Sequence, residues 1–401
     1  MLPSYNGESG WQVCNLTEQN GGKCNTKEEL LDNCKAASIL GTLQAGYTQF
    51  DYLTEISKKI IEREALIGVS ITGWMANPKT LFDKENMIAG AEEVKKWNKI
   101  VAEMISINQA ARTTCAKPSG NASVILATDS GIHGAHAPMY FRNVQMNEQD
   151  DVLELIRKVN PDMIEQSAWS STGTDYVVSF PVVSKEGSIY KQDLLGVKQL
   201  EYVKLAQQYW VEYGTNVELC VDPKLRHNIS NTITVDDWDE VEQYLFDNRQ
   251  YFAGVSLLSS MGDKAYVQAP FTEVFTAEQI VGKYGNASLL ASGLIIDGLH
   301  AFGDNLWVAC DNVNGFSNKA DTILKVDWVR RAKKFADNFF NGDYLEMTNC
   351  LKDCHNFHKW VTINRNMKPI DFAEQLTEKT FIDADTLASQ GCAGGLCEIT
   401  W

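Results

Sequence analysis

Two cysteines near the C-terminus have the type and spacing of a redox pair. Cys392 and Cys397 are separated by the four residues Ala-Gly-Gly-Leu. The two glycines let this segment fold back, so the two sulfurs can meet as a disulfide, and a terminal position lets the pair travel. The alternative is two incidental exposed thiols. A metal site is disfavoured, because C-x4-C lacks a second ligand pair at a recognised spacing.

A turn of small residues could hold an anion. The segment "PSGNAS" at positions 118–123 contains a glycine and two serines. Such a turn can offer backbone N–H groups and side-chain donors to a phosphate. Taken alone, a plain turn is the simpler interpretation.

The other reactive side chains have structural interpretations when each is taken by itself. Cys14 lies in the apolar run "WQVCNL", and a lone cysteine in a strand is most often a small buried hydrophobe. His227 and His300 are expected to be structural. A zinc-like cluster contains Cys350, Cys354, His355 and His358. Its C-x3-C and H-x2-H spacings fall at or outside the usual windows and place all four groups on one expected helix, so we predict no metal site.

Composition limits the class of protein. Among 401 residues, 44% are hydrophobic and 22% are charged, which is typical of soluble globular proteins. The formal charge of −16 repels a polyanion, so nucleic-acid binding is not expected. With no apolar run of membrane length and no visible secretory signal, we expect a cytoplasmic protein with reduced thiols, in the host cytoplasm if a phage encodes it.

Periodicity predicts the elements that must position these groups. Apolar residues at three- and four-residue spacing indicate helices over 27–45, 90–107 and 195–213. The runs "WQVCNL", "SVILA", "DYVVSFPVV" and "NISNTITV" indicate strands, and aspartates after the last run cap a further helix. Alternating strands and helices predict an α/β fold with a largely parallel sheet or barrel.

Six segments, in order along the chain, resemble one family: the large catalytic component of class II, adenosylcobalamin-dependent ribonucleotide reductase. They are "VCNLTE" at 13–18, "ARTTCAKPSGNAS" at 111–123, "SGIHGAHAPMYFRNV" at 130–144, "LRHNISNTITV" at 225–235, "YVQAPFT" at 266–272 and "GCAGGLCEI" at 391–399. The resemblance implies the second half of a ten-stranded α/β barrel over residues 1–343. It also implies a C-terminal segment, 344–401, ending in a flexible redox tail.

The resemblance assigns roles to residues. In the family, a thiyl-radical cysteine in an Asn-x-Cys-x-Glu motif precedes a redox cysteine, and Cys14 matches the redox cysteine. The radical motif should lie just upstream of "LPSYNGESG", where only Met1 is present. We therefore expect a partner chain, the N-terminal fragment of the same reductase, to supply the radical cysteine, its glutamate and the second redox thiol.

The implied chemistry is reduction of ribonucleoside di- or triphosphates to deoxyribonucleotides. Adenosylcobalamin would supply the radical to the assembled complex. Cys392 and Cys397 would re-reduce the active-site disulfide, with thioredoxin or glutaredoxin as the external reductant. The family's phosphate-holding loop corresponds here to Ser119, Gly120, Asn121, Ala122 and Ser123.

Two alternatives remain open at this point. A class I large-subunit fragment would carry an adjacent Tyr-Tyr pair near its C-terminus, and none is present. A class III enzyme would carry a glycyl-radical motif where this chain has "GCAGGLCEITW". The other possibility is a non-catalytic remnant, or a thiol-disulfide carrier that regulates another enzyme.

Overall fold

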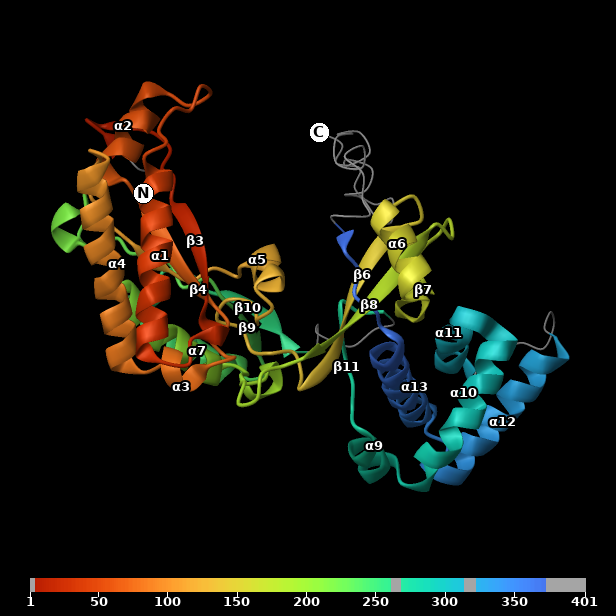
Figure 1. Ribbon diagram of the computed structural model, residues 1–401. Coiled ribbons are helices and arrows are strands. Elements are labelled where there is room, and N and C mark those ends of the chain that lie inside the picture. Colours follow the sequence, from red (N-terminus) through yellow and green to blue (C-terminus); the bar gives the residue numbers. More distant parts are fainter. Residues whose placement is uncertain (1–3, 261–267, 314–321, 373–401) are drawn as a thin grey trace. The chain divides into compact units, whose positions relative to one another are not determined.

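The computed structural model describes residues 4–260, 268–313 and 322–372 (Figure 1). Spatial contacts divide the chain into two units, each built from two stretches. Unit 1 comprises Met1–Ala137 and Ser184–Lys264, and unit 2 comprises Pro138–Val183 and Ala265–Trp401. The predicted division at residue 343 stays a prediction.

Unit 1 is built around a parallel sheet with strand order β3-β4-β5. The strands are β3 (Asn15–Asn20), β4 (Ile67–Thr72) and β5 (Thr114–Cys115). All six residues of β4 are buried, as expected of the central strand of a parallel sheet. A small antiparallel hairpin, β1 (Ser4–Tyr5) with β2 (Glu8–Ser9), and a parallel pair, β9 (Thr232–Val235) with β10 (Ser256–Ser259), complete its strands among the described residues.

Helix α1 (Lys27–Ala45) covers one face of this sheet, and α4 (Lys84–Met104) packs on α1. The other helices of unit 1 are α2 (Glu55–Glu64), α3 (Pro78–Leu81), α5 (Gly120–Ile125), α7 (Val197–Ala206) and α8 (Trp238–Asp247). Thr26 and Glu29 form a capping box that fixes the start of α1. Figure 1 shows α1 and α4 side by side next to β3 and β4, and the hydroxyl of Thr17 on β3 donates to Ala37 O of α1 at 3.1 Å. The opposite face of β3 and β4 is therefore the one left for a site.

Unit 2 combines an antiparallel sheet with a group of helices. The sheet order is β11-β6-β8-β7, with β6 (Met139–Asn147), β7 (Ile164–Gln166), β8 (Asp175–Val183) and β11 (Phe271–Glu273). The helices are α6 (Asp151–Val159), α9 (Ala277–Tyr284), α10 (Asn286–Phe302), α11 (Leu306–Asp311), α12 (Ile323–Phe340) and α13 (Tyr344–Asn366). Their core includes Trp328, whose indole N–H donates to Leu294 O at 2.8 Å.

The α/β class is confirmed, with one strand predicted wrongly and another predicted too early. Of the run "WQVCNL", only Asn15 and Leu16 belong to β3, so Cys14 precedes the strand. The helix over 27–45 and the strand over 175–183 have their predicted bounds. The run "SVILA" is not a strand: its first three residues belong to α5, which starts where Ser119 takes a left-handed φ of 54°. The sheet is parallel in unit 1 and antiparallel in unit 2. The ten-stranded barrel stays a prediction. Among the described helices, none is long and apolar enough to cross a bilayer.

Candidate functional site

One face of the unit 1 sheet carries functional groups at three levels. Alternate residues of a strand point to the same side, so Gly68, Ser70 and Thr72 of β4 share a face, which we call the ladder face. Val69 and Ile71 point the other way, into the hydrophobic core beneath the helices. Successive levels of the ladder face are separated by about 6.6 Å along the strand.

Two thiols meet at the level of Gly68. A Cβ atom built at this glycine would lie 2.8 Å from Cys14 Sγ and 3.1 Å from Cys115 Sγ, so the missing side chain leaves room for both sulfurs. Burial raises the pKa of Cys14 to about 11, against the opposing charges of Lys117 and Arg112. Burial also raises the pKa of Cys115 well above its usual value. At neutral pH both groups are therefore thiols rather than thiolates.

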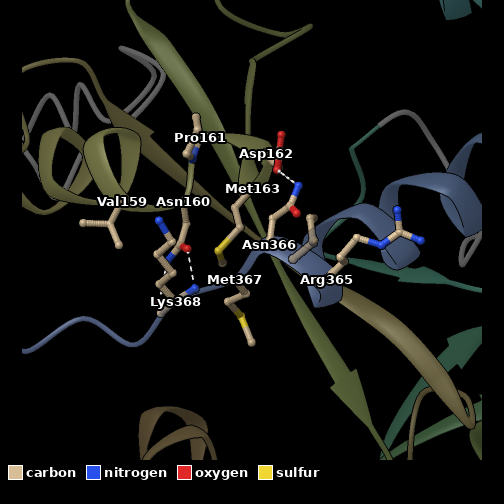
Figure 2. A pocket seen from close by; sticks show the side chains of 10 residues that line it. Val159, Asn160, Pro161, Asp162, Met163, Arg365, Asn366, Met367 and Lys368 are labelled. Carbon is tan, nitrogen blue, oxygen red and sulfur yellow. Dashed lines mark hydrogen bonds between the residues drawn. The ribbon is translucent and has the colours of Figure 1, made fainter.

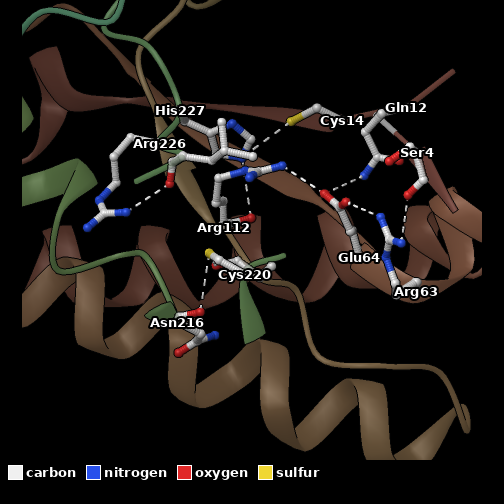
Figure 3. Close-up of polar contacts among 12 residues, drawn as sticks. Ser4, Gln12, Cys14, Arg63, Glu64, Arg112, Asn216, Cys220, Arg226 and His227 are labelled. Atoms are coloured by element: carbon white, nitrogen blue, oxygen red, sulfur yellow. Dashed lines mark hydrogen bonds and ion pairs between the residues drawn. The ribbon is translucent and has the colours of Figure 1, made fainter. Parts of the chain in front are cut away.

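His227 lies against Cys14 (Figure 3). Its Nε2 is 3.7 Å from Cys14 Sγ, 3.0 Å from Ile67 O and 3.3 Å from Arg112 O. Because the two carbonyls can only accept, Nε2 carries the proton and donates to the backbone. Burial, with the nearby Arg112 charge, lowers the pKa of His227 to about 4, so the ring is neutral at pH 7. His227 thus joins two backbone carbonyls, in line with the structural role predicted for it, and it also presents an N–H edge to the Cys14 thiol.

A buried ion pair places a fixed positive charge beside this level. Arg112 contacts Glu64 at 2.8 Å, with side-chain exposures of 9% and 6%, and Arg63 contacts the same carboxylate at 2.7 Å (Figure 3). Cys220 lies nearby, with its thiol 3.4 Å from Asn216 O. The Arg112 charge lowers the pKa of Cys14, against the larger effect of burial.

A carboxyl group occupies the level of Ser70. Glu18 pairs in register with Ser70, whose hydroxyl donates to Glu18 Oε1 at 3.0 Å and accepts from Lys117 N at 2.9 Å. Burial raises the pKa of Glu18 to about 7. Leu16, one position closer to Cys14 on this face, is 45% exposed. The ladder face is therefore partly exposed at Leu16, beside the carboxyl group, whereas Gly68, Ser70 and Thr72 themselves are buried.

The predicted phosphate-binding residues lie at the level of Thr72. The Thr72 hydroxyl donates to Asp129 O at 2.9 Å, so its contact with Ser119 uses the serine's proton. The Ser123 hydroxyl is likewise occupied, by Gly120 O at 2.8 Å. The first N–H groups of α5 have no acceptor within the helix. The backbone at Gly120, Asn121 and Ala122 is thus better placed to receive an anion than the two hydroxyls are.

The structure brings some predicted site residues together. Cys14 and residues 119–123 lie at opposite ends of the ladder face, whereas Cys392 and Cys397 lie outside the described residues. Single residues in the sequence did not indicate Glu18, Cys115 or the contact of His227 with Cys14. All three lie in segments that carry the family resemblance, and Glu18 is four residues after Cys14, an even spacing that places both side chains on the same side of extended chain.

The cysteine-histidine cluster of α13 does not converge on a metal. Cys350 and Cys354 face the helical core, His355 stacks on Trp307 at 5.0 Å, and His358 Nε2 is 3.2 Å from the Ser292 hydroxyl. Across residues 4–260, 268–313 and 322–372, no group of three or more candidate metal ligands occurs.

A pocket of ≈ 450 Å³ in unit 2 contains none of the predicted site residues (Figure 2). It lies where the end of α13 meets the turn after α6. Asn160 Nδ2 donates to Lys368 O at 2.9 Å, and Lys368 N donates to Asn160 Oδ1 at 2.7 Å. Asn366 donates to Asp162 at 2.8 Å. These contacts join two segments of unit 2, so the pocket is interpreted as structural.

Comparison with known proteins supports the resemblance. No family model matches the chain. The adenosylcobalamin-dependent ribonucleoside-triphosphate reductase of Euglena gracilis is 25% identical over 230 residues, which cover 56% of this chain and 29% of that protein. The enzyme of the same name from Lactobacillus acidophilus is 24% identical over 293 residues, covering 63% of this chain and 37% of that protein.

A solved structure shares the fold. The crystal structure of a B12-dependent (class II) ribonucleotide reductase superposes with a TM-score of 0.54 at 18% identity, covering 67% of this chain and 39% of that one. This chain is similar in sequence to adenosylcobalamin-dependent ribonucleoside-triphosphate reductases and shares the fold of a class II ribonucleotide reductase. It spans about a third of the length of the curated relatives that it matches.

Proposed function

We propose that this chain contributes the electron-donating and phosphate-holding side of a ribonucleotide reductase active site. One observation carries the proposal: Cys14 and residues 119–123 lie at two ends of the ladder face. Gly68 and Thr72 are four residues apart on one strand, which is about 13 Å. This separation suits a ribose held at the thiols with its phosphates at the start of α5.

The proposed reaction balances with two thiols. Two thiols become one disulfide, a ribonucleotide loses its 2′-hydroxyl as water, and the two electrons and two protons from the thiols complete the deoxyribonucleotide and the water. Cys14 is one donor, and it is held protonated by burial. We assign the second thiol to another polypeptide, as the resemblance implies. Cys115 is the competing candidate within this chain.

The cofactor enters the proposal through the relatives, whose names state dependence on adenosylcobalamin. When bound, it supplies the initiating radical. The described residues offer no group that we assign to its binding. The proposal therefore concerns what this chain's own thiols and loop do, and the cofactor is assigned to the assembled complex.

The remaining parts of the proposal follow the same resemblance. The family's thiyl-radical cysteine and glutamate have no match in this sequence, and we propose that a separate polypeptide provides them. Cys392 and Cys397 would exchange with the active-site disulfide and pass electrons from thioredoxin or glutaredoxin.

Reconstitution tests the proposal. The chain is assayed with adenosylcobalamin, dithiothreitol and either CDP or CTP, alone and with a polypeptide that carries the Asn-x-Cys-x-Glu motif. We expect deoxycytidine nucleotide only in the mixture. Product from the chain alone would contradict the need for a second polypeptide. No product in the mixture would favour a non-catalytic thiol carrier.

Disulfide mapping identifies the partner of Cys14. The chain, with and without the second polypeptide, is oxidised with diamide and digested, and cross-linked peptides are identified by mass spectrometry. We expect Cys14 to be linked to the other polypeptide in the mixture. A Cys14–Cys115 link as the main product would instead place both electron donors in this chain.

The tail is tested by changing the reductant. Cys392→Ser should abolish thioredoxin-driven turnover, because the exchange needs both tail sulfurs, and leave dithiothreitol-driven turnover measurable. Equal loss with both reductants would count against the shuttle.

A further inference from the structure

We propose that Glu18 binds the sugar hydroxyls of a ribonucleotide whose phosphates lie at residues 119–123. This inference rests on the proposed function and adds to it a residue to which the resemblance gives no role. The carboxyl group lies on the ladder face at the level of Ser70. The thiols lie one level away at Gly68, and the loop lies one level away on the other side at Thr72.

The order of the levels carries the argument. A nucleotide that extends from the loop toward the thiols must pass the level between them, because all three sets of groups follow one strand. Adjacent levels are about 6.6 Å apart, a distance that a glutamate side chain and one hydrogen bond can span. The hydroxyls of a ribose held at the thiols therefore lie within reach of Glu18, which is the only carboxyl group on β3 and whose charge, together with the larger effect of burial, raises the pKa of Cys115.

The contacts of Glu18 leave hydrogen-bonding capacity for a ligand. A carboxyl group has two oxygens, and the Ser70 hydroxyl donates to one of them, Oε1. Nothing in the described part of the chain forms an ion pair with it. By contrast, the neighbouring Gln19 points to the other face, where its amide contacts the buried Cys34 thiol at 3.5 Å. Glu18 is thus the side chain of this pair that faces the open side.

The groups around Glu18 define its response to pH. Cys14 directly precedes the strand of Glu18, β4 presents the uncharged Ser70, and β5 with the residues after it presents Cys115 and Lys117. Burial raises the pKa of Glu18 to about 7, with the Ser70 hydrogen bond opposing. Near neutral pH the carboxyl group therefore exists in both forms, so it can donate to a sugar hydroxyl or accept from one.

Calorimetric titration separates the sugar from the phosphates. The full chain is titrated with CTP, with 2′,3′-dideoxy-CTP, which lacks both hydroxyls, and with inorganic tripolyphosphate. The variants are Glu18→Ala and Glu18→Gln, and the matched control is Glu103→Gln, an exposed glutamate of α4. Thermal unfolding of each variant confirms that it is folded.

We expect Glu18→Ala to weaken CTP binding about tenfold, while tripolyphosphate and dideoxy-CTP change less than about twofold. In the wild type, the ratio of CTP to tripolyphosphate affinity should change between about pH 6 and about pH 8, and Glu18→Gln should flatten that change. The control should match the wild type with every ligand.

The contrary outcomes are distinct. If tripolyphosphate binds but Glu18→Ala leaves CTP unchanged, or weakens all three ligands equally, the inference is wrong and the phosphate site stands. If dideoxy-CTP weakens as much as CTP, Glu18 does not act on the hydroxyls and the inference is wrong. If tripolyphosphate does not bind the wild type at all, the phosphate site fails and the inference fails with it.

Discussion

Two glutamates, one in each unit, differ in their hydrogen-bond partners and in the direction in which their pKa is shifted. Glu165 of unit 2 accepts from Lys359 Nζ at 2.8 Å and from Gln268 Nε2 at 3.0 Å. Burial alone would raise the pKa of Glu165, but the charge and hydrogen bond of Lys359, together with the Gln268 hydrogen bond and the His355 charge, lower it. Glu18 of unit 1 has a serine hydroxyl in place of a cation, and burial raises its pKa to about 7.

The difference separates a group used for packing from one available to a ligand. Around Glu165 the donors are matched internally, since Lys359 also donates to the Ser179 hydroxyl at 2.8 Å. The same holds for Asp353 of unit 2, which accepts from Tyr284 at 2.7 Å. On the ladder face, the thiols, the carboxyl group and the backbone amides follow one another without a full set of internal hydrogen-bond partners. A folded chain tolerates this cost where a ligand supplies the missing contacts.

The comparison of the two units predicts that the largest effect on activity follows the loss of the Cys14 thiol. Cys14→Ser should reduce dithiothreitol-driven multiple turnover in the reconstituted system by at least about a thousandfold, because serine cannot form the disulfide. Stability should hardly change, since Cys14 is only half-buried. Cys350→Ser in unit 2 should do the reverse, lowering the urea midpoint because a hydroxyl enters the helical core. Normal turnover by Cys14→Ser would remove this residue from the mechanism.

The next effect is on the stability of unit 2. Lys359→Met removes the cation and leaves Glu165 partly buried without it, which should cost about 3 kcal/mol of unfolding free energy. Lys352→Met is the matched control, because its partner Asp311 is more exposed and 3.3 Å away, and it should cost less than about 1 kcal/mol. Urea denaturation measures both. Equal losses of unfolding free energy would mean that the Glu165–Lys359 pair stabilises unit 2 no more than the exposed Asp311–Lys352 pair does.

Substituting one glycine in each unit by alanine tests how much space is left for a Cβ atom. Gly68→Ala would place a Cβ 2.6 Å from Leu16 and 2.8 Å from Cys14 Sγ, so the thiol must shift, at a cost of about 1–3 kcal/mol. Gly293→Ala on α10 meets open space and should stabilise the helix by about 1 kcal/mol. Thermal unfolding gives the two signs, and iodoacetamide labelling of Cys14 reports its displacement. An unchanged labelling rate in Gly68→Ala would show that the sulfurs do not share this space.

The sequence predicted the features that nearby residues determine, and it did not predict those that depend on contacts between distant residues. The start of α1 was readable because its capping box lies within four residues, and β8 because its apolar run is continuous. The segment after Ser119 was wrongly predicted as a strand. The left-handed φ of Ser119 starts a helix there, and composition gives no signal of that conformation. The meeting of Cys14 with Cys115 depends on strand pairing across about a hundred residues, which periodicity does not encode. The loop was found because its chemistry is local.

The smallest effect has opposite signs in the two units. The folded-state pKa of Glu18, about 7, lies above the unfolded value of 4.5, so between these values the native state binds more protons than the unfolded state. Stability from this group must therefore fall as the pH rises through that window. After allowance for solvent screening the loss should be about 1 kcal/mol, and Glu18→Gln should abolish it.

Glu165 must behave in the opposite way. Its pKa is lowered in the folded state, so its contribution is complete above 4.5 and is lost only as the pH falls through the lowered value. Urea unfolding of the wild type, Glu18→Gln and Glu165→Gln across pH gives each contribution as a difference from the wild type, which cancels the titration of Asp129 and the buried histidines. If the two difference curves have the same sign of slope, Glu18 is compensated like Glu165, and the ladder face has no carboxyl group left for a ligand.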